Sequence, residues 1–245
     1  MAKTAEYQPR TYRHWTKGRD LVSYNIAVKE TDLYVRTATN LKSKAERFVL
    51  KYREPLEKYI SLYPYFYTSL EPVTAVKGAP RIVKEMVEAS AKVGVGPMAA
   101  VAGALAEFVG KELLAYSPEV IIENGGDIFL KSLKKRVIGI YAGNSPLTGK
   151  IGIEIEPKDT PIGVCTSSGT VGHSLSFGKA DAVTILAKSS LLADAAATAI
   201  CNIVQTSDDI TRAIEFARTI DGLQGISIII GNKIGIWGRV KICSL

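Results

Sequence analysis

The sequence is poor in the residues that bind soft metals, with only two histidines and three cysteines in 245 residues. Cys165, Cys201 and Cys243 lie far apart, and no Cys-x-x-Cys or closely spaced Cys/His pair indicates a zinc site. Their odd number and their small or apolar neighbours favour buried, reduced thiols. We therefore expect a cytoplasmic protein.

Long hydrophobic segments are also lacking. The longest uncharged run of small and apolar residues, 93–106, is too short to cross a bilayer. The amino terminus, MAKTAEYQPR, has no apolar core of the kind found in secretory signals. With 47% hydrophobic and 22% charged residues, the composition is that of a folded globular protein. No membrane partner is expected.

Acidic residues are fewer than basic ones, 24 against 31, which gives a formal net charge of +7. Such an excess favours anionic partners, including nucleotides and nucleic acids. The aromatic and glycine pattern of an RNA-recognition sheet does not occur, however. Nucleic-acid binding therefore remains a minor alternative, and the oligomeric state cannot be read from the sequence.

The periodicity of apolar residues predicts an α+β fold, with a mainly antiparallel sheet packed with helices. Short turns separate apparent strands from 119 to 187, and we expect these strands to form one sheet covered by helices 79–116 and 190–204. No repeat or low-complexity linker divides the chain, which favours a single domain over residues 1–245. Further predicted elements are an opening hairpin at 21–37, a helix at 41–63, a helix at 207–220 and a closing hairpin that turns at 231–233.

Glycines recur every seven residues in the helix "GVGPMAAVAGALAEFVG", at Gly96, Gly103 and Gly110. Such a face lets another backbone approach closely. The approaching group could be a neighbouring structural element or a ligand, and the sequence leaves both open.

Two polar segments interrupt the predicted strands. "ENGGDIF" places Asn124, Gly125, Gly126 and Asp127 between apolar residues, which suits a β-turn or a backbone approach to a flat or anionic ligand. "CTSSGTVGHSLSFGKAD" gathers hydroxyls, glycines and His173 in one loop. Such a loop can bind phosphate through its amides and hydroxyls, or it can be a surface loop.

Asp194 and Thr198 interrupt the apolar run "SSLLADAAATAI". Four residues apart, they share one helical face. With a diphosphate present, one carboxylate and one hydroxyl are enough protein ligands for Mg²⁺. The alternative is a solvent-facing helix edge, with Asp194 in the first turn favoured by the helix dipole.

The order of these segments, "AGALAE", "NGGD", "TSSG", His173 and "ADAAAT", resembles that of the flavin-transferase family ApbE. That family has an N-x-G-G turn, a T-S-G loop, a downstream histidine and an A-D-A-x-x-T helix. The resemblance covers roughly residues 90–205. "KETDLYVRT" and "IENGGDIFLKS" are similar to a compact, uncharacterised branch of the family in archaea and bacteria.

The resemblance implies an ApbE-like fold that binds FAD with Mg²⁺ and either hydrolyses FAD or transfers FMN to an acceptor protein. Asp194 and Thr198 would bind the metal, helped by a carbonyl near Ala193, and His173 would be the general base. Ser168 and Gly169 would meet phosphate, and Gly125 and Gly126 would line the nucleotide or flavin. The full set of cofactor-binding residues implied is Gly103, Glu107, Asn124, Gly125, Gly126, Thr166, Ser167, Ser168 and Gly169.

The sequence also departs from the family pattern. "HSLSFGKAD" replaces the family's H-I-x-D-P-x-T-G, Ala102 stands where the family has lysine, and Glu107 stands where it has aspartate. The departures leave two hypotheses open. One is a Mg²⁺-dependent FAD-processing enzyme, and the other is a noncatalytic ApbE-like binding protein that serves as an accessory in sulfur or methanogenic metabolism.

Overall fold

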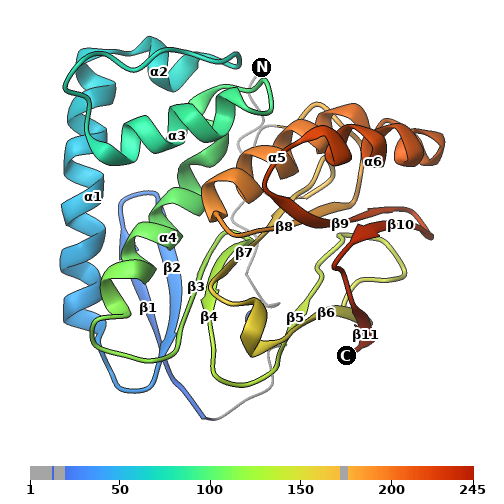
Figure 1. Ribbon diagram of the computed structural model, residues 1–245, viewed down its shortest axis with the longest axis horizontal. Coiled ribbons are helices and arrows are strands. Elements are labelled where there is room, and N and C mark those ends of the chain that lie inside the picture. Colours follow the sequence, from blue (N-terminus) through green and yellow to red (C-terminus); the bar gives the residue numbers. More distant parts are fainter. Residues whose placement is uncertain (1–12, 14–19, 172–175) are drawn as a thin grey trace.

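A computed structural model of the chain describes residues 13, 20–171 and 176–245. Two antiparallel sheets and six α-helices make up the described part (Figure 1). The large sheet has the strand order β1-β2-β3-β4-β7-β8-β9-β10. Its strands are β1 (Val22–Val28), β2 (Thr31–Thr37), β3 (Val120–Asn124), β4 (Asp127–Lys131), β7 (Ile162–Ser167), β8 (Ala182–Ala187), β9 (Leu223–Ile230) and β10 (Lys233–Gly238).

Four helices, α1, α4, α5 and α6, lie against one face of this sheet, and α2 and α3 pack on other helices (Figure 1). α4 packs on β3 and β4, α5 on β7 and β8, and α6 on β9 and β10. α1 packs on β1 and on α4. The helices are α1 (Lys42–Leu62), α2 (Tyr65–Thr68), α3 (Arg81–Ala91), α4 (Val101–Leu113), α5 (Ser190–Ile203) and α6 (Ile210–Thr219). In the described part of the chain, no helix has both the length and the apolar character needed to cross a bilayer.

The α+β fold with a large antiparallel sheet is therefore confirmed. The opening hairpin and the closing hairpin are also confirmed, as β1–β2 and β9–β10. The helix predicted at 41–63 is α1, which continues through Pro55 as one helix. Residues Thr206 and Asp209 form a capping box before α6.

One expectation about the sheet is wrong. Residues 119–187 do not form a single sheet, because β4 pairs directly with β7. The intervening strands β5 (Arg136–Gly139) and β6 (Ile151–Ile155) pair with each other, and β6 also pairs with β11 (Ile242–Ser244). Apolar side chains of β5 and β6, including Ile138 and Ile153, share a core cluster with those of β3 and β4. Alternating residues predict a strand, but they do not say which strands pair.

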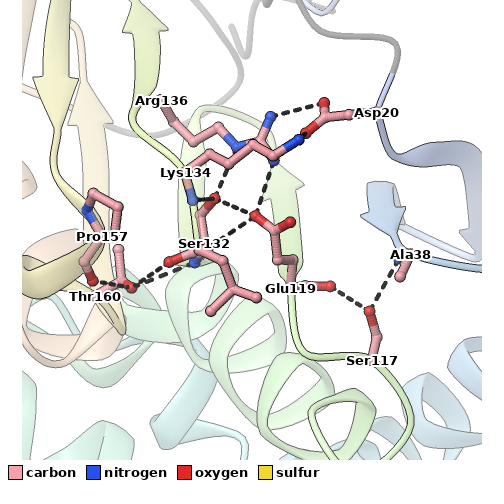
Figure 2. A network of polar contacts seen from close by, with 10 residues as sticks. Asp20, Ala38, Ser117, Glu119, Ser132, Lys134, Arg136, Pro157 and Thr160 are labelled. Atoms are coloured by element: carbon pink, nitrogen blue, oxygen red, sulfur yellow. Dashed lines mark hydrogen bonds and ion pairs between the residues drawn. The ribbon is translucent and has the colours of Figure 1, made fainter.

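A polar network ties the small sheet to the open end of the β3–β4 hairpin (Figure 2). Arg136, at the start of β5, donates to both carboxylate oxygens of Asp20 at 2.9 and 2.8 Å and to Oε2 of Glu119 at 2.9 Å. Ser132 and the Leu133 amide also donate to Glu119 Oε2. The bidentate contact and the shared carboxylate fix β5 beside the strand that begins after Glu119.

Candidate functional site

The opposite end of the β3–β4 hairpin is closed by Gly125 and Gly126. Asn124 and Asp127 face each other in the register, and both glycines have positive φ, 69° and 109°. A two-residue hairpin loop that requires positive φ at both positions selects glycine. The Gly126 amide donates to Glu123 Oε1 at 2.9 Å, and Asn124 Nδ2 donates to the Ala102 carbonyl at 3.2 Å. The turn is thereby connected to the start of α4.

The glycine face of α4 meets another helix at Gly103. A Cβ atom there would lie 2.3 Å from the Ser190 carbonyl oxygen, so only glycine lets the α4 and α5 backbones approach this closely. Gly110 fits instead against the ring of Phe129 on β4, and Gly96 against the backbone of Ser69. Close packing within the protein thus accounts for all three positions.

The two helices exchange carboxylate caps where they cross. Asp194 of α5 accepts a hydrogen bond through Oδ2 from the Gly103 amide at 2.8 Å, in the first turn of α4. Glu107 of α4 accepts one through Oε2 from the Ser190 amide, the first residue of α5. Each acid meets free amides and the positive end of the partner helix dipole. Glu107 Oε1 also pairs with Lys111 at 2.6 Å, so both of its oxygens have partners within the chain.

Asp194 is buried, with 9% of its surface exposed, and it caps α4 from the fifth position of α5. The alternative of a solvent-facing helix edge is therefore wrong. Burial raises the pKa of Asp194 to about 7, although the Gly103 and Ala102 amides favour the ionised form. The tight contact at Gly103 brings α5 close enough to α4 for this acid to be enclosed.

Asp127 is the second buried acid, with 6% of its surface exposed, and together with Asp194 it forms what we call the carboxylate pair. Burial, and then the charge of Asp194, raises the pKa of Asp127 well above its usual range. Its Oδ1 atom has no hydrogen-bond partner among the described residues. Sequence reasoning treated Asp127 as a turn residue and missed this role, since only its position before the apolar strand "IFL" hinted at burial.

Cys165 lies beside the carboxylate pair, opposite Asp127 in the register of β4 and β7. Its thiol donates to the Ser190 carbonyl at 3.4 Å. Burial, together with the charges of Asp127 and Asp194, raises the pKa of this thiol well above its usual range. A thiol held in its neutral form is a poor nucleophile.

The hydroxyl loop continues from the same end of β7. Ser168 Oγ accepts hydrogen bonds from the amides of Thr170 and Val171, at 3.1 and 3.0 Å. A Cβ on Gly169 would lie 1.9 Å from the Gly178 carbonyl oxygen, so the base of the loop is closely packed. Ser167 is buried on the helix-covered face. Adjacent strand residues face opposite sides, so the Thr166 side chain points away from the carboxylate pair and contacts Thr184 Oγ1 at 2.9 Å.

The structure therefore brings part of the expected site together. Asn124, Gly103 and Asp194 meet around the start of α4, and Asp127 joins them. Thr198 is half-buried one turn after Asp194 on α5. Thr166 contributes no side chain to this group. His173 lies outside the described residues.

The available ligands at the carboxylate pair are oxygens, which suit a hard cation such as Mg²⁺. No group of three or more His, Cys, Asp and Glu side chains that could hold a metal occurs in residues 13, 20–171 and 176–245. Neither Asp127 nor Asp194 forms an ion pair with Lys, Arg or His in those residues. The Oδ1 of Asp127, which has no partner among the described residues, is an oxygen of the kind that would fit such a cation.

Comparison with protein families gives a match over most of the chain. A family model described as "AbpE bacteria" matches residues 13–222. The UPF0280 protein MJ1526 of Methanocaldococcus jannaschii is 48% identical over 221 residues, which cover 88% of this chain and 90% of that protein. The UPF0280 protein MK0206 of Methanopyrus kandleri is 43% identical over 233 residues, covering 92% and 94%.

Solved structures share the fold. The apo form of the Pseudomonas stutzeri flavinyl transferase ApbE superposes with a TM-score of 0.57 at 13% identity, over 91% of this chain and 95% of that one. The ApbE protein of Thermotoga maritima also gives a TM-score of 0.57 at 13% identity, over 88% and 96%. The expected similarity in architecture is confirmed, and at this identity the likeness concerns the fold alone.

Proposed function

The chain belongs to the ApbE-like family, and from this premise we propose that it binds a flavin nucleotide, FAD, together with Mg²⁺, and processes it. The carboxylate pair carries the proposal, because two buried acids without a basic partner in the described residues mark a site that a cation would complete. The solved structures of similar fold include one described as a flavinyl transferase. That description motivates the choice of flavin.

The residues have distinct roles in this proposal. Asp194 and Thr198 would hold the cation from α5, and Ser168 and Gly169 would meet the diphosphate. Mg²⁺, when bound, would neutralise the negative charge that develops on the diphosphate oxygens during phosphoryl transfer. Gly125 and Gly126 form a tight, sterically open turn against which the nucleotide or flavin would lie.

The reaction proposed is attack of a hydroxyl oxygen on the FMN phosphorus of FAD. The new P–O bond would replace the bond to the AMP phosphate, and AMP would leave. A Ser or Thr of an acceptor protein as attacking group gives FMN transfer, whereas water gives hydrolysis. The proton of the attacking hydroxyl would go to His173 as general base.

A noncatalytic flavin-binding protein is the second candidate, and Ala102 favours it. This residue lies in the first turn of α4, which Asp194 caps, and its methyl group supplies no positive charge for a phosphate where the ApbE pattern has lysine. Glu107 also favours this candidate, because both of its carboxylate oxygens already have partners within the chain. Binding without turnover would follow if these positions are needed for catalysis.

The test of the proposal is a titration of FAD into the wild type and Asp194→Asn, each with Mg²⁺ and with chelator. The asparagine can still accept the Gly103 hydrogen bond, so the variant should fold. We expect Mg²⁺ to tighten FAD binding to the wild type by about tenfold or more. The affinity of Asp194→Asn for FAD should be the same with Mg²⁺ and with chelator. Asp208→Asn, at an exposed acid before α6, is the matched control.

Equal Mg²⁺ dependence in the wild type and Asp194→Asn would contradict a metal role for Asp194. The release of AMP from FAD with Mg²⁺ then separates the two candidate functions. Release that His173→Ala abolishes supports the enzyme, and tight binding without release supports the accessory protein.

A further inference from the structure

We propose that Asp127 is a direct ligand of the cation, and that it and Asp194 together hold a divalent cation before any nucleotide is bound. The inference rests on the proposed cation site, but it concerns a residue outside the D-x-x-x-T pattern. It also changes the order of binding, because the cation could bind before the nucleotide. One carboxylate and one hydroxyl need a diphosphate to complete the site, whereas two carboxylates can bind the free cation.

The position of Asp127 on β4 directs its side chain toward the helices. Phe129, two residues later on the same face, packs against Gly110 of α4. Asn124, opposite Asp127 in the register, reaches the Ala102 carbonyl at the start of α4. Since residues two apart on a strand share a face, Asp127 faces the region where α4 and α5 cross. The influence of the Asp194 charge on its pKa agrees with this placement.

The donors near the turn leave one oxygen of Asp127 unsatisfied. Asn124 Nδ2 donates to the Ala102 carbonyl, the Gly126 amide donates to Glu123, and the Gly103 amide donates to Asp194, the other acid of the pair. The Thr166 amide favours the ionised form of Asp127. Within residues 13, 20–171 and 176–245, the Oδ1 atom of Asp127 is left without a hydrogen-bond partner, at a position that is 6% exposed. A buried oxygen without a partner is costly, and a directly bound cation removes that cost.

The charge of the site leads to the same conclusion. Asp127 and Asp194 carry two negative charges when ionised, and a divalent cation neutralises them together. With Arg or Lys absent from the pair within the described residues, the cation is the partner of matching charge. Thr198 then adds a neutral oxygen, and water fills the remaining positions until a diphosphate displaces it.

The experiment uses Mn²⁺ alone, without nucleotide, and follows the loss of the free Mn²⁺ signal by electron paramagnetic resonance. The proteins are the wild type, Asp127→Asn, Asp194→Asn and the control Asp208→Asn. We expect the wild type and the control to bind one Mn²⁺ with equal affinity. Asp127→Asn and Asp194→Asn should each weaken this binding by about tenfold or more.

Thermal unfolding with chelator and with Mg²⁺ separates loss of the ligand from misfolding. In chelator, Asp127→Asn should melt no lower than the wild type, because it removes one charge from the buried pair. Added Mg²⁺ should raise the melting temperature of the wild type and raise that of the variant less.

Two results would overturn the inference. The wild type could bind no Mn²⁺ without nucleotide, or a folded Asp127→Asn could bind it as tightly as the wild type does. If Asp194→Asn still removes the Mg²⁺ dependence of FAD binding in either case, the proposed function stands and Asp127 is no ligand. If neither aspartate affects cation or FAD binding, the proposed function fails as well.

Discussion

The two ends of the β3–β4 hairpin each bury carboxylates, but they surround them differently. Glu119, just before β3, is 8% exposed and receives hydrogen bonds from Ser132, the Leu133 amide and Arg136 (Figure 2). Asp127, at the turn end, is 6% exposed and has an oxygen without a hydrogen-bond partner in the described part of the chain. Burial alone raises an acid's pKa, yet the donors around Glu119 lower its pKa, while that of Asp127 is raised.

The contrast indicates different roles for the Glu119 end and the Asp127 end of the hairpin. Where an arginine compensates the buried acid, the cluster fixes one sheet on another. At the turn end, two buried acids influence each other's charge without a base in the described residues, which is the arrangement that the proposed cation site requires. Burial is similar at both ends, so the number of donors and positive charges makes the difference.

The largest effect on stability is expected from removing Arg136, the residue that balances the charge of buried Glu119. Arg136→Met keeps the apolar stem but leaves Glu119 buried without its cation. The pair is nearly buried, with side-chain exposures of 5% and 10%. We expect the free energy of unfolding to fall by about 3–5 kcal/mol, measured by urea denaturation.

Two further variants sharpen this test. Lys134→Met removes an exposed partner of Asp20 and should change stability by less than about 0.5 kcal/mol. Adding Glu119→Gln to Arg136→Met should recover part of the loss, because the uncompensated charge disappears. A loss below about 1 kcal/mol in Arg136→Met would show that the network does not hold the sheets together.

Substitution of Glu107, where α4 and α5 cross, should have an intermediate effect on the free energy of unfolding. Glu107→Ala removes the carboxylate that accepts from the Ser190 amide at the start of α5, and with it the partner of Lys111, while the Ser189 cap remains. We expect a loss of about 1–2 kcal/mol in urea denaturation, and a smaller loss in Glu107→Gln, which can still accept from the Ser190 amide. Unchanged stability with weakened FAD binding would instead assign Glu107 to the cofactor site, as the family resemblance implies.

The smallest expected effect is the pH dependence of stability that arises from Asp20 and Glu119, the two acids paired with Arg136. Hydrogen bonds from Arg136 lower the pKa of Asp20, and the donors around Glu119 lower its pKa despite burial. Acids with lowered pKa contribute stability above their ordinary pKa and lose that contribution as pH falls through the folded value. The difference in unfolding free energy between the wild type and Arg136→Met should therefore shrink as pH falls from about 5 to about 2. If the difference in unfolding free energy stayed constant across this range, the stabilisation by Arg136 would not depend on the ionisation of Asp20 and Glu119.

Local features of the sequence were enough to predict much of the fold. Alternating apolar residues predicted the hairpins β1–β2 and β9–β10, and the Gly125–Gly126 pair was consistent with a β-turn. These predictions succeed because periodicity and turn chemistry involve neighbouring residues only. The separation of β5 and β6 into a second sheet could not be predicted, because strand pairing joins distant segments.

For the candidate site, the sequence by itself determined that Asp194 and Thr198 share a helical face and that glycines recur along α4. Only the tertiary structure decided what those residues meet. Gly103 admits the α5 backbone, so Asp194 caps α4 and is enclosed beside Asp127. A carboxylate's burial and charge balance depend on every segment packed around it, and the segments that enclose this pair come from four separate elements: α4, α5, β4 and β7.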